Sequence, residues 1–482
     1  MTDQTTPPGE PAPELTSRFP TAYTILFLLI VFVAALTWII PAGQYDRVMN
    51  EEVGREIAVA GTYHEVDPNP QGFVDVMLAP IAGFYNPDSY AANAIDVALF
   101  VLFLGGFLGV VNATGAIDKG IKAAMFDMKG HQIWIIPIMM GLFALGGTTY
   151  GMAEETLAFY AILIPVMIAA GYDAVTGVAI ILIGAGIGVL GSTINPFATV
   201  IASNAASIPF TDGLILRLVL LLGGLVICAA YVMRYAHRVR TDPSRSVVAK
   251  QAEAHKKIFL QDKFGEETEA KLSGTQKVVL LIFAATFVVM IWGVSSQGWW
   301  MARMSALFLG SAIVIGLISR QGEKQLTGNF VDGARDLLGV ALVVGLARGI
   351  VVIMENGLIA DTILHGAEQT LGGLGELAFI NVMFWIELGM SFFVPSSSGL
   401  AVLSMPILAP LSDFAGVGRD LVVTAYQSAN GLVNLINPTF AVVIGGLAIG
   451  RVSYDRWIVF IWPLMLILLI FISVVLSIGA LF

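Results

Sequence analysis

The 482-residue sequence has little charge and almost no cysteine. Charged residues make up 12% of it, about half of the share typical of soluble domains, while 57% are hydrophobic. The single cysteine, Cys228, excludes an internal disulfide and argues against a catalytic cysteine cluster. Five histidines without HxxxH or CxxC spacing give no metal-binding pattern. No nucleophile–base pair, redox motif or nucleotide-binding fingerprint is present, and the scattered charge forms no basic patch. We therefore expect no enzyme, no bound cofactor or metal, and no nucleic-acid partner.

Long apolar runs take the place of the missing charge. A run of about 20 apolar residues spans a bilayer, so the sequence predicts an all-α polytopic membrane protein whose lasting partner is lipid. Residues 1–20 are polar and proline-rich, which is typical of a disordered tail. Full spans are predicted at 21–41, 93–113, 174–208, 214–235, 276–296, 300–319, 335–355, 419–450 and 456–481.

Two further apolar stretches, 131–170 and 376–412, are too long for one span. Each has a polar, turn-forming break in its middle: GGTTYGMAEET in the first and VPSSSG in the second. Non-helical backbone at membrane depth occurs only where protein or a water-filled cavity covers it. We therefore predict two re-entrant helical hairpins whose tips meet inside the protein.

Lysine and arginine are concentrated on one predicted side of the membrane. The segment 236–275 is strongly basic, whereas the loop 42–92 has two basic residues against eight acids. Basic loops stay in the cytoplasm. We therefore predict a multi-pass protein of the inner membrane, with its N-terminus in the cytoplasm and its C-terminus on the outer side. We expect 236–275 to be a solvated cytoplasmic linker, with a short amphipathic helix on the membrane surface as the alternative.

An internal repeat is visible. The motif GSTINPF (191–197) recurs as VNLINPT (433–439), 242 residues later, and the hairpins and their flanks keep that spacing within a residue. The charge pattern places the two halves in opposite orientations, and inverted repeats with broken helices are typical of secondary transporters. The predicted units are a first repeat at 21–235, the linker at 236–275, a linking transmembrane helix at 276–299 and a second, inverted repeat at 300–482.

Proline in both motifs predicts that the spans 174–208 and 419–450 are broken. Pro196 and Pro438 lack an amide hydrogen and each costs about 3 kcal/mol inside a helix. The carbonyls and helix ends that they free favour ions or charged substrates. Asn195 and Asn437 are the first candidates for substrate contacts, followed by Thr439. Possible ion ligands nearby are Ser192, Thr193, Asn430 and Asn434. A proline kink that only shapes packing is the structural alternative.

The two hairpin tips differ in charge. A carboxylate at the bilayer centre costs about 3 kcal/mol on insertion scales, so Glu154 and Glu155, followed by Thr156, should face a cavity. The second tip is neutral and presents Ser396, Ser397 and Ser398. Acid on one side and hydroxyls on the other suit a zwitterion with an extra positive charge. We expect one glutamate to cap a helix and the other to touch substrate or a coupling ion.

Other charges lie inside apolar segments. Arg348 has two possible partners, Glu355 and Glu387, and a structural ion pair is the favoured interpretation. The alternative is that Arg348 contacts an anionic substrate, which would favour a different transport function.

The hairpin GMAEETLAFYAILIPVMIAAGYD, the segment PSSSGLAVLSMPILAPLSD and the INP break after each resemble the YfcC-like proteins. Those are grouped with the anaerobic C4-dicarboxylate carriers and the basic amino acid antiporters. More distantly, the layout is similar to the divalent anion/sodium symporters, which have Ser-Asn-Thr motifs at both tips. This chain has Ala153-Glu154-Glu155-Thr156 and a serine run there instead.

The resemblance implies a scaffold domain, an elevator-type moving transport domain, a homodimer, and exchange of arginine- or ornithine-like amino acids. In that arrangement the hairpins and broken helices would move against the spans 21–41, 93–113, 276–296, 300–319 and 335–355. Two alternatives stay open. One is a sodium- or proton-coupled carrier of C4-dicarboxylates or short-chain carboxylates, in which a glutamate binds the proton. The other is a membrane sensor or assembly scaffold. Coupling to Na⁺ or H⁺ is possible in either transport function.

Overall fold

The structure is a computed structural model that describes residues 22–50, 55–117, 119–120, 132–260 and 272–481. Within these residues, nine helices are long and apolar enough to cross a membrane. Three shorter apolar helices accompany them. The predicted tail at 1–20, residue 131 of the first hairpin and 261–271 of the linker lie outside the described residues. The all-helical membrane architecture predicted from the sequence is confirmed.

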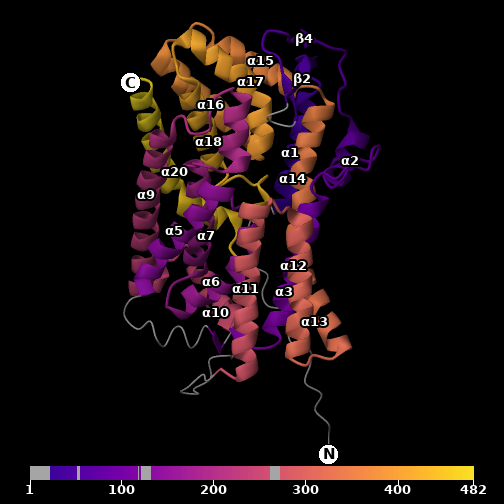
Figure 1. Cartoon of the computed structure of the whole chain (residues 1–482), viewed down its shortest axis with the longest axis vertical. Coiled ribbons are helices and arrows are strands. Elements are labelled where there is room, and N and C mark those ends of the chain that lie inside the picture. The colour runs from indigo at the N-terminus through magenta and orange to yellow at the C-terminus, as the bar shows by residue number, and fades with distance from the viewer. Residues whose placement is uncertain (1–21, 51–54, 118, 121–131, 261–271, 482) are drawn as a thin grey trace, which may run out of the picture.

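One group of helices stands at the centre and right of Figure 1 and includes the long helix α14, which contacts α1, α2 and α3. Helix α3 also packs along α12 and α13, and α11 packs against α12. Ser273 and Gln276 form a capping box that starts α11. The helices of this group are α1 (Ala22–Leu36), α2 (Phe73–Ala82), α3 (Ile95–Asn112), α11 (Gly274–Gln297), α12 (Met301–Ile318), α13 (Glu323–Asp336) and α14 (Leu338–Asn356).

A second group contains the predicted hairpins and broken helices. Helix α7 packs against α5, α6, α9 and α18, while α16 packs along α18. In Figure 1, α5 and α6 lie in the lower half of the molecule, and α16 and α17 lie in the upper half. The helices are α5 (Ile135–Tyr150), α6 (Leu157–Ala169), α7 (Ala174–Leu190), α8 (Ile201–Ala205), α9 (Leu214–Thr241), α16 (Glu376–Phe393), α17 (Ser397–Ala415), α18 (Arg419–Val433), α19 (Ala441–Ile449) and α20 (Tyr454–Gly479).

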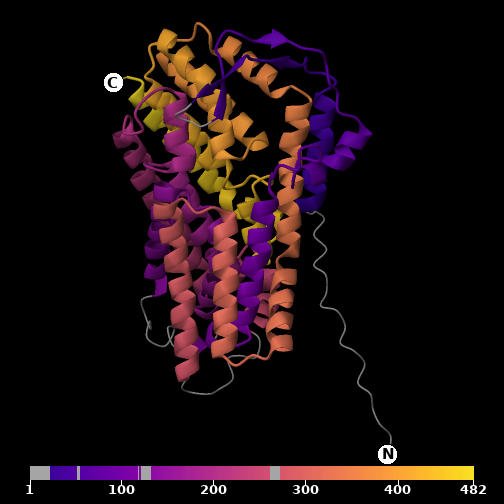
Figure 2. The same ribbon diagram turned by 45° about the vertical axis from the view of Figure 1, so that its right-hand side comes forward.

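One hydrophobic core runs through both groups. The groups meet where α14 contacts α19 and where α3 contacts α6. Figure 2, turned by 45°, shows α11 and α12 standing side by side at the lower front of the molecule.

Each predicted hairpin consists of two helices with a short interruption. Helix α5 ends at Tyr150, and the 3₁₀ turn η2 (Glu154–Thr156) leads into α6. Helix α16 ends at Phe393, and the Ser396 hydroxyl accepts the Gly399 amide at the start of α17. The interruptions fall on the polar breaks read from the sequence.

Both INP motifs interrupt a helix. Helix α7 ends at Leu190, and helical backbone resumes in the π-helical turn η3 (Pro196–Val200), which leads into α8. Helix α18 ends at Val433 and α19 begins at Ala441, so Pro438 lies in the gap. Proline cannot supply the amide hydrogen of a helix interior, which explains both breaks.

Several short elements were not predicted. In the loop after α1, β1 (Gly43–Gln44) pairs antiparallel with β4 (His64–Glu65), and β2 (Arg47–Asn50) pairs with β3 (Arg55–Ala58). Helix α15 (Ala360–Leu371) lies beside them at the top of Figure 1. The remaining short turns are η1 (Gln132–Trp134), η4 (Pro243–Arg245) and η5 (Ala249–Gln251).

The sequence favoured a solvated linker at 236–275, but the described part of this segment is largely helical and packed. Helix α10 (Ala252–Leu260) packs against α6. The side chain of His255 is only 4% exposed, and its Nε2 lies 3.0 Å from the Arg451 carbonyl. The described part of the linker is therefore docked on the helical body.

Candidate substrate-binding site

The two hairpin tips and the two helix breaks line one cavity of about 360 Å³. It lies where the second helical group faces α3, α12 and α14, which contribute Asp96, Met301 and Val344 to its wall. Eight of the residues singled out in the sequence line it: Glu154, Glu155, Asn195, Ser396, Ser397, Ser398, Asn434 and Thr439.

A glycine turn forms the first tip. Gly151 has a left-handed backbone with φ of +77°, and an added Cβ would lie 2.6 Å from Asn195 Oδ1. Only glycine fits both the backbone conformation and this close approach. The turn places Glu154 half-buried on the cavity wall, while Glu155 is 6% exposed. Glu155 Oε2 accepts the Ala153 amide at 3.0 Å, so Glu155 serves as the cap of the turn.

Asn195 holds the first break against the first hairpin. Its Oδ1 accepts the amides of Phe197 and Ala198, which caps the helical segment after the break. Its Nδ2 donates to the Gly147 carbonyl in the last turn of α5 at 3.3 Å. Asn195 lines the cavity, but its amide is already engaged by the backbone.

Asn437 has the same role in the second break. Its Nδ2 donates to the carbonyls of Ser391 and Phe392 at 3.1 Å, in the last turn of α16. Its Oδ1 accepts from both the amide and the hydroxyl of Thr439. Each INP asparagine thus connects its helix break to the last turn of the first helix of its hairpin, α5 or α16.

Asn434 lines the cavity and has an acceptor that is unpaired within the described part of the chain. Its Nδ2 donates to the Pro395 carbonyl at 3.0 Å and to Asn430 Oδ1 at 3.1 Å. Its own Oδ1 is buried and has no hydrogen-bond partner among the described residues. An acceptor in this state is suited to a cation or an N–H group.

The other predicted site residues lie behind the cavity wall. The Thr156 hydroxyl donates to the Ala153 carbonyl, Ser192 bonds Thr199, and Thr193 bonds Thr148. Asn430 and Asn437 are fully buried between helices. Pro196 and Pro438 shape the breaks. None of these seven residues is part of the described cavity lining.

Sequence reasoning missed several residues of the wall, and Asp96 and Trp300 are the two that form a polar contact with each other. Asp96 lies in the first turn of α3, and its carboxylate accepts a hydrogen bond from the Trp300 indole. The charged groups that interact with Glu154 are Glu155 and Asp96, both acidic. An acid in the first turn of a helix is usually interpreted as a residue that stabilises the helix start. The position of Asp96 on the cavity wall with the first hairpin tip is therefore visible only in the folded structure.

Arg348 is the one basic residue in the described cavity lining. Its Nη2 lies 3.6 Å from Glu355 Oε1, and its side chain is 33% exposed. The pair with Glu355, one of the two possibilities open in the sequence, is therefore the one that forms. The distance is long and the guanidinium keeps contact with the cavity, so anion binding by Arg348 is still compatible with the structure.

The candidate site is continuous with a larger outer cavity of about 720 Å³. Arg348, Trp300 and Phe197 contribute to both walls, together with Val351, Ser396 and Ser398. A third cavity of about 590 Å³ lies at the opposite end, beside α10. Its described lining shares no residue with the candidate site. The site is thus open toward the end of the molecule that carries α15 and the strands.

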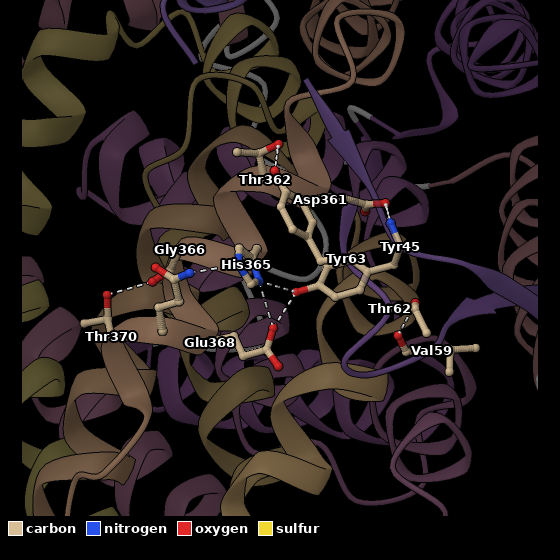
Figure 3. A network of polar contacts seen from close by, with 11 residues as sticks. Tyr45, Val59, Thr62, Tyr63, Asp361, Thr362, His365, Gly366, Glu368 and Thr370 are labelled. Carbon is tan, nitrogen blue, oxygen red and sulfur yellow. Dashed lines mark hydrogen bonds and ion pairs between the residues drawn. The ribbon is translucent and has the colours of Figure 1, made fainter. Parts of the chain in front are cut away.

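A polar network holds the loop after α1 against α15 at the outer cavity (Figure 3). Arg47 Nη2 donates to both carboxylate oxygens of Asp361, at 2.9 and 2.8 Å, and Asp361 also accepts the Tyr45 amide. The Tyr45 hydroxyl donates to Glu368 at 2.7 Å, while the Tyr63 ring stacks on His365. Burial and the hydrogen bond to Glu368 raise the pKa of the Tyr45 phenol, which keeps it a donor.

Comparison with known proteins gives the family. The family model for C4-dicarboxylate anaerobic carriers matches residues 19–481. The chain belongs to this family. Its members are multi-span membrane carriers, which agrees with the resemblance seen in the hairpins and INP motifs.

Two curated relatives span nearly the whole C4-dicarboxylate carrier-like chain. A Haemophilus influenzae protein without a functional name is 36% identical over 96% of this chain and 97% of its own. The Escherichia coli protein YfcC, provisionally named a basic amino acid antiporter, is 31% identical over 96% of both chains. Among solved structures, the Alcanivorax borkumensis YdaH transporter aligns over 95% of this chain and 98% of its own, with 13% identity and a TM-score of 0.40.

Proposed function

We propose that this carrier is a secondary active transporter of basic amino acids that works as an arginine- or ornithine-like antiporter by alternating access. The observation that carries the proposal is the acidic cavity at the hairpin tips. Asp96, Glu154 and Glu155 contribute three carboxylates, against one arginine that is already close to Glu355. A cationic side chain would offset the repulsion among these acids.

The neutral second tip is suited to bind the carboxylate group of an amino acid. Ser396, Ser397 and Ser398 line the same cavity at the start of the 19-residue helix α17. The positive end of a helix dipole and serine hydroxyls favour a carboxylate, and Arg348 lies on the same wall. The provisional name of the Escherichia coli relative agrees with a basic amino acid.

We further propose that the two hairpin units form an inverted repeat and move as an elevator against the group around α14. The repeated order of hairpin, helix and INP break supports the repeat, as do the opposite ends at which the hairpins lie in Figure 1. The basic linker argues for an inner-membrane orientation with the N-terminus in the cytoplasm and the C-terminus outside. A homodimer stays a prediction from the family resemblance.

The second candidate is a sodium- or proton-coupled carrier of C4-dicarboxylates or short-chain carboxylates. The family description and the position of Arg348 on the cavity wall favour it. A dicarboxylate would then bind beside Arg348 and the serines. It would also require protonation of Glu154 or Glu155, because two ionised carboxylates repel a dianion.

Exchange in proteoliposomes tests the choice. Vesicles with the full-length protein are loaded with unlabelled arginine or succinate and offered the labelled compound. We expect labelled arginine to enter arginine-loaded vesicles, and labelled succinate to stay outside in both loadings. Succinate exchange without arginine exchange would overturn the amino acid proposal, and no exchange of either would contradict both candidates.

A further inference from the structure

The second hairpin contains a buried carboxylate that the proposed substrate contacts do not use. Glu387 lies in α16 and is 0% exposed. Within the described part of the chain, neither of its carboxylate oxygens has a hydrogen-bond partner. The hydroxyl of neighbouring Ser404 on α17 donates to the Leu400 carbonyl at 2.9 Å instead.

No described positive charge compensates Glu387. Helices α15, α17, α18 and α20 pack against α16, and Tyr426 on α18 is the titratable side chain that interacts with Glu387. Glu376, on α16 itself, lies at the exposed start of the helix. Four ion pairs engage other charged groups of these helices: Asp361 with Arg47, His365 with Glu368, Asp413 with Arg419, and Asp455 with Arg456. Asp420 interacts electrostatically with Arg217.

This environment favours the neutral acid. An ionised carboxylate without a counter-charge or a hydrogen bond is strongly disfavoured in a low-dielectric interior, whereas the protonated form is tolerated. The position 242 residues earlier is Leu145, so the first hairpin has no acid at the matching position.

A seam of buried polar groups connects Glu387 with the candidate site. Ser391 lies one turn further along α16, and Asn430 donates to its hydroxyl at 3.5 Å. Asn434 donates to Asn430 and lines the cavity. On the other side of the seam, the Tyr426 hydroxyl donates to the Ser397 carbonyl at the hairpin tip. Movement of the tip and cavity wall is therefore passed by hydrogen bonds to Ser391, one turn from Glu387, and to Tyr426, which interacts with Glu387. Among the described residues, none of these bonds reaches the carboxylate itself.

We propose that Glu387 is a proton-binding site of the carrier, coupled to substrate through the second hairpin. The proton stays on the carboxyl in the packed conformation. It leaves to water when a change at the tip separates α16 from α18 and solvates the carboxylate. The inference rests on the proposed transport function and adds a proton to its cycle.

The first test measures proton movement in liposomes that contain the full-length protein and a trapped pH-sensitive dye. Wild type should take up labelled arginine faster when a pH gradient is imposed across the liposome membrane. The dye should report proton movement that accompanies this uptake. Glu387→Gln should keep arginine–arginine exchange at equal pH and lose both the gradient response and the dye signal. Glu376→Gln, which removes an exposed carboxylate from the same helix, should behave like wild type.

The outcomes separate the two proposals. Absence of arginine exchange in wild type contradicts the proposed function. Normal exchange together with a wild-type proton signal in Glu387→Gln contradicts the proton site alone. The proton site alone is also contradicted if wild type exchanges arginine but its uptake does not respond to the pH gradient.

A second measurement needs neither a variant nor a substrate. Dicyclohexylcarbodiimide reacts with protonated carboxyl groups in apolar surroundings, and peptide mass mapping locates the adduct. We expect wild type to be modified at Glu387 in acidic buffer and much less in alkaline buffer. Absence of the adduct at Glu387 in acidic buffer, or modification independent of pH, would overturn the proposal even if Glu387→Gln does not fold.

Discussion

The two hairpin units have the same order of elements but differ in where they place acid. The first has Glu154 and Glu155 at its tip, while the second has serines at the tip and Glu387 buried behind it. In both units the INP asparagine donates a hydrogen bond to a carbonyl in the last turn of the first hairpin helix, α5 or α16. The comparison shows that the repeated motif sets the backbone geometry, and that the remaining side chains decide what the cavity attracts.

The two tips also turn in different ways. The first uses the left-handed conformation of Gly151, whereas the second passes through Pro395 to the capped start of α17. The first turn therefore depends on one small residue packed against Asn195, while the second depends on the serine cap.

The largest effect is expected at the acidic tip. Glu154→Gln should weaken arginine binding by about 30-fold or more, because removing a charge that contacts a bound ion costs ~2–5 kcal/mol. Ser397→Ala, the matched change at the neutral tip, should cost clearly less. Binding is measured by the competition of unlabelled arginine with labelled arginine. A Glu154→Gln variant with wild-type affinity would remove Glu154 from the site.

The turn of the first tip is the next most sensitive feature. Gly151→Ala should lower the free energy of unfolding by ~2 kcal/mol, through backbone strain and contact with Asn195. Gly399→Ala is the milder comparison change, because Gly399 does not have a positive φ and its added methyl would meet Ser396 at 3.3–3.4 Å, a tight distance that a small shift relieves, against 2.6 Å to Asn195 at Gly151. Thermal unfolding in detergent compares the two. Equal loss in both variants would contradict the asymmetry of the tips.

The INP asparagines should differ from one another by a smaller amount. Asn437→Ala should destabilise the protein by about 1 kcal/mol more than Asn195→Ala, since an unpaired buried polar group costs ~1–3 kcal/mol. Both side chains are buried. Asn437 engages two carbonyls at 3.1 Å and both the amide and the hydroxyl of Thr439, whereas Asn195 engages one carbonyl at 3.3 Å and the amides of Phe197 and Ala198. The same thermal measurement applies. A larger loss for Asn195→Ala would show that the first break is the tighter one.

The smallest effect is expected in the outer network, whose residues are not part of the described lining of the candidate site. Arg47→Gln should change stability by ~1 kcal/mol or less, because Arg47 is 37% exposed and exposed ion pairs contribute little. Asp361→Asn should cost more, since Asp361 is 4% exposed and also accepts the Tyr45 amide. A double-mutant cycle with both changes measures the coupling. A coupling well above that of an exposed pair would assign the outer network a larger structural role.

Much of the fold could be predicted because its signals are local. Long apolar runs mark the spans, and a proline or a polar turn inside a run marks each break. The strands β1 to β4 and helix α15 were missed, since they are short and are held by partners such as Arg47 and Asp361 that lie far apart in sequence. The docking of α10 through His255 depends on a carbonyl near residue 451 that no local pattern reveals.

The candidate site was predicted in outline but not in its division of roles. Polar residues at tips and breaks were correctly expected to gather, because lipid excludes them. Their partners depend on tertiary structure, so Asn195 and Asn437 ranked first as ligands although the backbone engages their amides. Asp96 was missed because an acid at the start of a helix has no distinctive pattern.

The central claim is that the acidic tip selects a cationic substrate. Arginine and its uncharged analogue citrulline, which has a similar shape, are compared as competitors of labelled arginine exchange in wild type and in Glu154→Gln/Glu155→Gln. Wild type should prefer arginine strongly, and the double variant should lose that preference while it stays folded. A double variant that keeps the preference for arginine, or a wild type inhibited by succinate and not by arginine, would contradict the account.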